Sequence, residues 1–247
     1  MKTKTTPILR VAACLAALTT LGASWAGAQD ALDVSVGVDV VSRYIWRGID
    51  AADAPSMQPS MTLSVRGLSV GAWGSYSLSN NLTQGDEIDL WLGYTHELSE
   101  GGSLGVLFTD YYFPNAGGGL SNYRNYDTPD GPGAHVLEVG AIFTPPSVPV
   151  SLAAYVNIYN DEGHNVFFQA SYPFAVGGTS LTLFAAATPG SEKNPGYYGT
   201  DQFKFLHVGI TAKKEVPVSD RFSLPLWISW SANPNLDIAY LVVGFSL

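Results

Sequence analysis

Apolar and polar residues alternate along this chain from residue 32 onward. Between Leu32 and Trp46 the even positions are mostly apolar or aromatic, whereas Asp, Ser, Gly and Arg fall mostly on odd positions. In Met57–Arg66 the alternation has no exception. Successive side chains of a strand point to opposite faces of its sheet, so each segment would have one apolar and one polar face. Because no helical period competes after residue 28, the pattern predicts an all-β fold.

Twelve such segments follow one another along the chain. We expect their boundaries to be accurate to about 2–4 residues. They are Leu32–Trp46, Met57–Arg66, Leu68–Leu78, Glu87–Leu98, Leu104–Phe113, Ala134–Thr144, Ser151–Tyr159, Asn165–Tyr172, Thr179–Thr188, Phe203–Lys213, Phe222–Ser231 and Leu236–Leu247.

The connections between these segments alternate between short and long. Those after even-numbered segments are short, and those after odd-numbered segments are mostly longer and rich in Gly, Asn, Asp and Pro. The exceptions are Asn160–His164 and Ala232–Asn235. Short turns at one end, long loops at the other and an even strand number are typical of outer-membrane barrels. The sequence therefore predicts a transmembrane antiparallel up-and-down β-barrel of about 12 strands.

Aromatic residues lie near both ends of the apolar face, as in the interfacial girdles of membrane barrels. The predicted girdle positions are Tyr44, Trp46, Tyr76, Tyr112 and Trp230 at the long-loop end, and Tyr94, Phe143, Tyr172, Phe222 and Phe245 at the short-turn end. The final segment Leu241–Leu247 resembles the C-terminal signal read by the barrel-assembly machinery, with Leu replacing the usual terminal Phe. A soluble lipocalin-like barrel, which would bury the same face, is the alternative that alternation alone leaves open.

Residues 1–28 have the features of a secretory signal peptide. Met1–Arg10 carries three positive charges, Val11–Leu21 is mostly apolar, and Ala26–Ala28 is a small-residue cleavage pattern. We expect a cleaved segment 1–28 and one barrel domain, 29–247, in the outer membrane of a Gram-negative bacterium. Cleavage at Cys14 with lipid attachment is the alternative, although only three apolar residues separate Cys14 from Arg10.

Composition and charge narrow the possible functions. Only 13% of residues are charged, against roughly 25% in ordinary soluble domains. The formal charge of −9 becomes −12 when Lys2, Lys4 and Arg10 leave with the signal peptide, so nucleic acid is a poor partner. Cys14 is the sole cysteine, and the mature chain would therefore have neither a disulfide nor a cysteine metal site.

If the apolar face meets lipid, the polar face lines a lumen. The residues predicted at its constriction are Arg43, Arg47, Gln58, Trp73, Glu87, Asp89 and Glu138. These charges either select small polar solutes or form an ion-pair plug that holds the barrel shut, and both interpretations stay open. A wide pore is not expected, because large aromatic side chains also point inward by parity. They are Trp73, Trp91, Trp227, Tyr155, Tyr159, Phe167 and Phe184.

Acidic residues dominate the predicted long-loop end. The acids there are Asp50, Asp53, Asp86, Asp127, Asp130, Asp161, Glu162, Glu192, Asp201 and Asp237, against Arg124, Lys193 and Lys204. An acidic mouth would concentrate cations, which predicts a weak cation preference. Simple solvation, or divalent bridging to lipopolysaccharide, is the alternative role of these acids.

Catalysis finds little support in the sequence. The histidines His96, His135, His164 and His207 lack HExxH spacing, and there is no GxSxG or phosphate-binding glycine motif. Outward-facing His135 has no adjacent nucleophile of the kind a barrel phospholipase would use. Asp161–His164 could touch a metal, but a polar turn is the simpler interpretation. We expect no enzyme activity and no cofactor.

Several short motifs together resemble a known family. They are Tyr44–Ile49 with Pro55 and Gln58, Gly71–Ser75, Glu87–Asp89 with Gly93 and Tyr94, and Tyr112–Pro114 with Glu138. As a set they resemble the TorF-like porin family, conserved hypothetical outer-membrane β-barrel proteins of Gram-negative bacteria. The resemblance covers roughly residues 30–145 and implies an exported barrel with a pore. Family motif positions that fall on the lumen face include Arg47, Gln58, Trp73, Glu87 and Asp89.

We therefore expect a monomeric outer-membrane porin that gives passive diffusion of small polar solutes or ions through a narrow charged lumen. Its other partners would be outer-membrane lipid and lipopolysaccharide. The alternative is a closed structural or surface-binding barrel without transport. The role of the long connection Pro114–Gly133 is left open.

Overall fold

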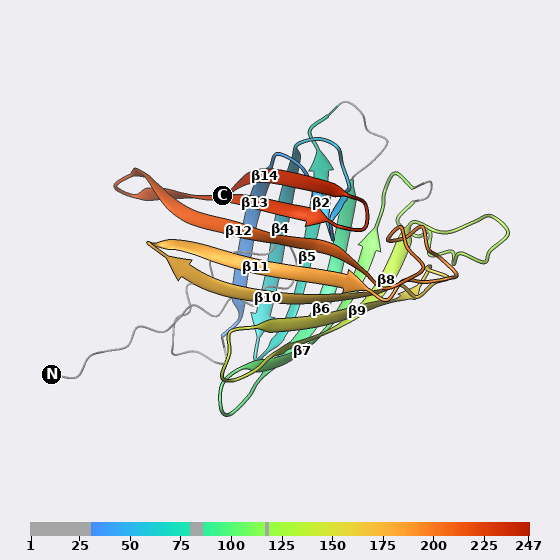
Figure 1. Ribbon diagram of the computed structural model, residues 1–247, viewed down its shortest axis with the longest axis horizontal. Helices are drawn as coiled ribbons and strands as arrows, with labels where there is room; N and C mark the ends of the chain where they lie inside the picture. The colour runs from blue at the N-terminus through green and yellow to red at the C-terminus, as the bar shows by residue number, and fades with distance from the viewer. Residues whose placement is uncertain (1–30, 80–85, 117–118) are drawn as a thin grey trace.

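Twelve antiparallel strands close into a barrel in this computed structural model, which describes residues 31–79, 86–116 and 119–247 (Figure 1). The predicted strand number and barrel fold are confirmed, whereas the predicted signal peptide lies outside the described residues. The barrel strands are β1 (Asp33–Val41), β4 (Ser56–Val65), β5 (Leu68–Ser77), β6 (Glu87–Glu97), β7 (Ser103–Tyr112), β8 (His135–Thr144), β9 (Ser151–Tyr159), β10 (Val166–Val176), β11 (Thr179–Thr188), β12 (Lys204–Ser219), β13 (Phe222–Asn233) and β14 (Ile238–Ser246).

The prediction of one strand from Leu32 to Trp46 is wrong. The wall strand β1 ends at Val41, and the chain leaves the wall between Ser42 and Pro55, whose backbones still bond to Val243 and Leu78. There it forms β2 (Ile45–Trp46) and β3 (Ile49–Asp50), which pair only with each other. We call residues 42–55 the inner hairpin. Because Tyr44 and Trp46 keep the even phase of β1, alternation could not reveal where the chain leaves the sheet.

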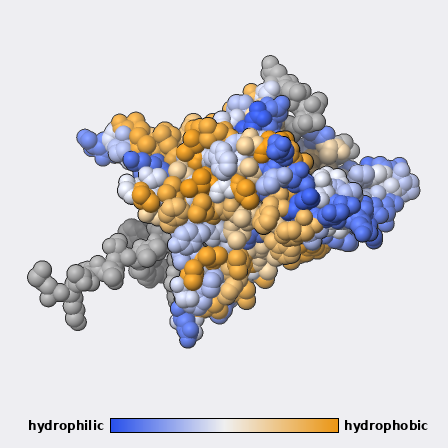
Figure 2. All heavy atoms as spheres, viewed as in Figure 1, coloured by the Kyte–Doolittle hydropathy of each residue, from blue (hydrophilic) through white to orange (hydrophobic). Residues whose placement is uncertain are grey.

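The outside of the barrel is apolar, as the alternation predicts. Figure 2 shows hydrophobic side chains gathered over the strands and hydrophilic ones over the loops at the end opposite the β12–β13 turn. Outward positions such as Val36, Leu92 and Val106 are half exposed or more, at 71%, 50% and 55%. The predicted girdle residues Tyr94 and Trp230 are also exposed. Among the described residues, no helix is long and apolar enough to span a bilayer.

Four inward aromatic rings lie across glycines of a neighbouring strand. Trp91 faces Gly71 in the strand register, and a Cβ added to Gly71 would lie 2.4 Å from the Trp91 ring. The other three pairs are Tyr155 with Gly140, Phe184 with Gly209 and Trp227 with Gly244. Because each ring occupies the space of a missing side chain on the wall, these aromatics fill less of the lumen than parity suggested.

One inward aromatic was wrongly predicted. Tyr159 pairs with the outward residue Leu137 rather than continuing the inward set, because a register shift separates Leu137 from Glu138. Its hydroxyl donates to the backbone oxygen of Tyr123 at 2.6 Å, in the connection between β7 and β8. Bulges of this kind change which face a residue occupies, and the sequence carries no clear sign of one here.

Candidate functional site

The inner hairpin turns at Arg47 and Gly48, and its tip reaches the wall at β12 and β13. Both residues have positive φ, 49° and 82°, as a two-residue type I′ turn requires. The Gly48 oxygen accepts a hydrogen bond from Asn233 Nδ2 of β13 at 3.1 Å. A Cβ on Gly48 would lie 2.1 Å from the backbone oxygen of Leu206 in β12. Glycine at this position therefore allows the hairpin tip to pack directly against the wall.

Arg47 ties the hairpin to β8. Its guanidinium makes a bidentate pair with the Glu138 carboxylate, at 2.7 and 2.8 Å, and also donates to the Tyr198 hydroxyl at 2.7 Å. Tyr111 of β7 donates to the same carboxylate at 2.8 Å. The side chains of Arg47 and Glu138 are only 10% and 1% exposed. Charge-assisted bidentate bonds are among the stronger polar contacts in proteins, so this pair is a specific anchor.

Aromatic rings surround the Arg47 guanidinium. Its central carbon lies 4.8, 5.0 and 4.5 Å from the ring centroids of Trp46, Tyr155 and Phe167. Cations at such distances from a ring are attracted by its quadrupole. Residues from the hairpin, β9 and β10 thus form one closed cluster across the lumen.

Tyr44 anchors the opposite side of the hairpin. It is buried, its hydroxyl donates to Glu87 Oε2 at 3.0 Å, and its ring packs 5.4 Å from that of Trp73. Asp89 follows Glu87 on the inward face of β6, opposite Trp73 in the register. Within the described residues, Asp89 Oδ1 and Trp73 Nε1 are buried without hydrogen-bond partners. The prediction that Tyr44 and Trp46 belong to an outer aromatic girdle is therefore wrong.

The predicted constriction set divides into separate groups. Arg47 joins Glu138, whereas Glu87, Asp89 and Trp73 gather around Tyr44. Arg43 stays within the hairpin: it pairs with Asp50, and its Nη2 lies 2.9 Å from Asp53 Oδ1. Gln58 of β4 is buried, and its Nε2 donates to Ser75 Oγ at 3.4 Å. Arg43 and Arg47 thus come from the inner hairpin and not from a wall strand.

A second segment covers the hairpin, and sequence reasoning missed it. The connection 189–203 places Tyr198, 1% exposed, in a stacked contact with Trp46 at 6.0 Å. Tyr197 packs against the same indole at 6.0 Å. Burial raises the pKa of Tyr198 to about 12, so the hydroxyl facing Arg47 stays protonated at neutral pH. Two adjacent tyrosines in a Gly-, Asn- and Pro-rich connection were the available signal.

Asp161 holds this second segment in place. Its buried carboxylate accepts hydrogen bonds from the side chains of Asn157, Asn165 and Asn194, at 2.8 to 3.0 Å, and from the Asn165 backbone N–H. Burial opposes ionisation, but these hydrogen bonds outweigh it and lower the pKa of the Asp161 carboxyl. Asn194 belongs to the connection 189–203, so Asp161 fixes the segment that carries Tyr198.

The lumen nearer the short turns carries many small polar side chains beside the inward aromatic rings described above. These polar side chains are half-buried rather than buried, in contrast to the residues around the hairpin. The Thr211 hydroxyl, for example, donates to Ser229 Oγ at 2.9 Å. The inward positions there include Ser60, Thr62 and Ser64 of β4, Ser69 of β5, Gln169 of β10, Thr182 of β11, Thr211 of β12 and Ser229 of β13. Hydroxyl and amide groups therefore line much of the lumen on the short-turn side of the inner hairpin.

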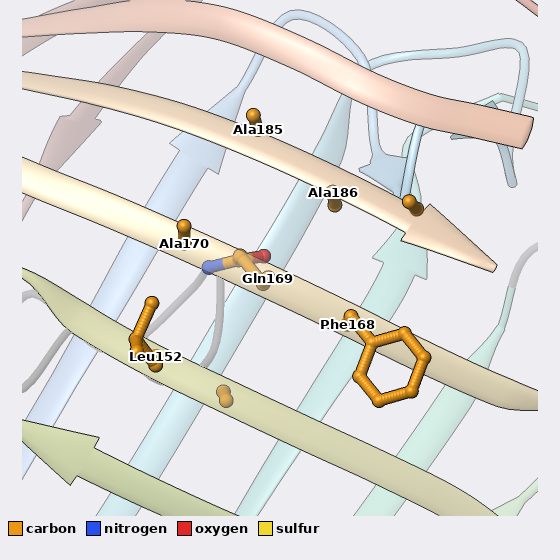
Figure 3. Close-up of a pocket in the computed structure, with 8 residues that line it drawn as sticks. Leu152, Phe168, Gln169, Ala170, Ala185 and Ala186 are labelled. Carbon is orange, nitrogen blue, oxygen red and sulfur yellow. The ribbon is translucent and has the colours of Figure 1, made fainter.

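A depression on the outside of the barrel does not belong to the site. A shallow depression of about 260 Å³ lies at the wall of β9–β11, where Leu152 and Phe168 flank Ala170 and Ala185 (Figure 3). It is mostly apolar and opens between exposed outer side chains. In the described parts of the chain, no group of His, Cys, Asp and Glu could hold a metal ion.

Three solved structures are similar to this chain at low sequence identity. The COG4313 outer membrane channel from Pseudomonas putida F1 is 15% identical, with a TM-score of 0.43 over 89% of this chain and 97% of that one. OprD from Pseudomonas aeruginosa is 18% identical, with a TM-score of 0.38 over 87% and 66%. BamA from Haemophilus ducreyi, lacking POTRA domains 1–3, is 10% identical, with a TM-score of 0.32 over 87% and 69%. At these identities and TM-scores, the similarities give no information on function.

The sequence itself gives a clearer assignment. No curated protein matches the chain. The family model for Gcw_chp, described as bacterial protein of unknown function, matches residues 25–223. The name TorF-like is carried by none of these matches and stays a resemblance. Because the family model spans most of the barrel, the chain belongs to the Gcw_chp family.

Proposed function

We propose that this protein is an outer-membrane channel for small polar solutes or ions, closed in this conformation by the inner hairpin. The observation that carries the proposal is the contrast along the lumen. A hydrophilic interior lies below a hairpin that is held by a few specific contacts, chiefly Arg47 with Glu138 and Tyr44 with Glu87. A barrel that served only as a scaffold would have no need of a hydroxyl-lined interior.

The hairpin is suited to act as a gate because it is not part of the wall. β2 and β3 pair only with each other, so the hairpin could move without breaking a barrel hydrogen bond of its own strands. Its anchors include side-chain contacts to β6, β8, β13 and the connection 189–203. Release of these contacts would open the lumen at the long-loop end.

Charge supports a weak preference for cations. Arg47 is already paired with Glu138, whereas Glu87 is bound by the Tyr44 hydroxyl and by the neighbouring Asp89 side chain. Glu87 and Asp89 would then present negative charge to a solute passing the displaced hairpin. The acidic residues in the connections at the long-loop end would also favour cations.

The apolar outer wall supports a location in the outer membrane of a Gram-negative bacterium, surrounded by lipid and lipopolysaccharide. Assembly through the barrel-assembly machinery by Leu241–Leu247, export by residues 1–28 and a monomeric state belong to the same proposal.

A closed structural or surface-binding barrel is the second candidate. The completeness of the Arg47 cluster favours it, because the guanidinium is bound by a carboxylate, a hydroxyl and three rings. In that case the ion pair would serve stability alone.

Single-channel current in a planar bilayer separates the two candidates. The refolded chain 29–247, shown to be folded by its heat-modifiable mobility, should give rare conductance steps. Arg47→Ala should make them larger or more frequent, because it frees the hairpin from β8. Arg221→Ala, which removes an exposed cation at the β12–β13 turn, should conduct as the native chain does. Folded, inserted barrels that never conduct, with or without Arg47, would favour the closed barrel.

A further inference from the structure

A histidine on the outer face of the barrel holds part of the connection between β7 and β8. His135, the first residue of β8, is 1% exposed. Its Nδ1 lies 2.8 Å from Asp110 Oδ1 of β7, and its Nε2 lies 2.9 Å from the backbone oxygen of Leu120. Both ring nitrogens therefore face oxygen atoms, one on the wall and one on the connection.

Tyr123 of the same connection covers the imidazole. The Tyr123 ring stacks on His135 with centroids 3.7 Å apart, and Tyr112 of β7 stacks at 4.7 Å. The Tyr123 hydroxyl donates to Asp110 Oδ2 at 2.5 Å. That hydrogen bond raises the pKa of Tyr123 to about 12, so the phenol remains a donor throughout the physiological range. We call residues 119–134 the outer segment.

The chemistry of these acceptors decides how many protons the cluster holds. A backbone oxygen only accepts hydrogen bonds, as does an ionised carboxylate, whereas a neutral imidazole has a single N–H. Only an imidazolium can donate to Asp110 and Leu120 together. A neutral imidazole beside a protonated Asp110 would carry the same number of protons. With the outer segment docked, His135 and Asp110 together therefore hold one proton more than a neutral His135 with an ionised Asp110.

We propose that His135 is a pH-sensitive latch, which docks the outer segment on the barrel when protonated and releases it when deprotonated. Loss of the proton leaves a nitrogen lone pair facing an oxygen lone pair, at Leu120 or at Asp110. Docking is therefore complete at low pH and is lost as pH rises, since the docked state is the one that holds the extra proton.

Groups from β7, the outer segment and the β9 side surround His135. Asp110 and Tyr112 face it from β7, and Tyr123 faces it from the outer segment. From the β9 side, Tyr159 donates to the Tyr123 backbone oxygen, and Asn160 donates to the His135 backbone oxygen at 2.7 Å. The latch does not depend on whether the barrel conducts, because the cluster lies on the outer face.

A nitroxide at the exposed position 127 tests the latch, since residues 29–247 contain no cysteine and Asp127→Cys provides a single labelling site. In refolded barrels the label should be immobilised near about pH 5, and its mobile fraction should rise at least about threefold by about pH 8.5. His135→Gln should abolish this change. His164→Gln, which alters an exposed histidine of the neighbouring turn, should preserve it.

Other outcomes would overturn the proposal. They are a label whose mobility does not respond to pH in the native background, a response retained in His135→Gln, or a response lost in His164→Gln. Asp110→Asn should move the midpoint to lower pH by at least about one unit, because it removes the negative partner. If His135→Gln does not fold, NMR of the native barrel decides: both His135 ring nitrogens should be protonated where the label is immobile, and a singly protonated ring beside an ionised Asp110 there would refute the latch.

Discussion

Arg47 and Glu138 are 91 positions apart in the sequence, yet their side chains form a buried bidentate ion pair between the inner hairpin and β8. Arg47 has positive φ at the turn of the hairpin, and Glu138 lies on the inward face of β8 in regular register with β7. The turn of the hairpin thus brings the guanidinium to the carboxylate. Because both are largely withheld from water, either one alone would be a costly buried charge.

A double-mutant cycle measures this coupling. Glu138→Ala leaves the Arg47 guanidinium without its carboxylate and should lower the free energy of unfolding by about 3–5 kcal/mol. Adding Arg47→Ala should recover part of that loss, because the buried charge is removed. Urea unfolding, followed by the heat-modifiable band, gives the values. Strictly additive losses would contradict a direct interaction.

The Gly48 position tests how closely the hairpin tip approaches the wall. Gly48→Ala should destabilise the barrel by more than Gly178→Ala, although both glycines have positive φ. A Cβ at Gly178 meets no atom within 4 Å, so only the backbone cost of about 1–2 kcal/mol applies there. At Gly48 the Leu206 carbonyl must also move. Equal losses in urea unfolding would show that the tip is not held against β12.

The glycine facing Trp91 should control where that ring lies. Gly71→Ala would force the indole off the wall toward the lumen, because the new Cβ would lie 2.4 Å from the ring. We expect a shifted tryptophan emission maximum and smaller conductance steps. Gly105→Ala is the matched control, since its Cβ would make only ordinary contacts on the inward face of β7. Identical spectra for both variants would refute the stacking.

Low pH should loosen the connection 189–203, which carries Tyr198. The pKa of the Asp161 carboxyl is lowered in the folded protein. Its contribution to the stability of the fold is therefore fully present above its unfolded pKa of about 3.9, and it is lost as pH falls through the lower pKa of the folded protein. A nitroxide at Lys193→Cys should therefore become mobile only in strong acid. Asp161→Asn should make it mobile at neutral pH, whereas Asp201→Asn, on the same connection, should not. An immobile label in Asp161→Asn would show that other contacts hold the segment.

Cation preference should depend on the acids beneath the hairpin. In a salt gradient the reversal potential of Arg47→Ala channels should shift in the direction of cations. Glu87→Gln with Asp89→Asn should reduce the shift, whereas Glu100→Gln at a short turn should leave it unchanged. A reversal potential of the native channel that indicates anion preference would contradict the proposed selectivity.

Alternation was sufficient to predict the barrel because each wall strand has an apolar outer face and a largely polar face toward the lumen. The count of twelve and the outward set that includes Val36 and Leu92 follow from a period of two, and the spacing between the alternating segments separates short turns from long connections. Glu87, Asp89 and Glu138 were placed inward for the same reason. No long-range contact is needed to read this pattern, since each strand satisfies it locally.

Only the tertiary structure decided what closes the lumen. Ser42–Pro55 continues the phase of β1 but finds its partners on β6, β8 and β13, and Tyr198 reaches Arg47 from a connection 151 residues away. A residue's side of the sheet is a local property, whereas the point at which a chain leaves the sheet depends on contacts with distant strands. The sequence by itself therefore determined the barrel and its two faces, and the packing of distant residues determined the hairpin that closes it.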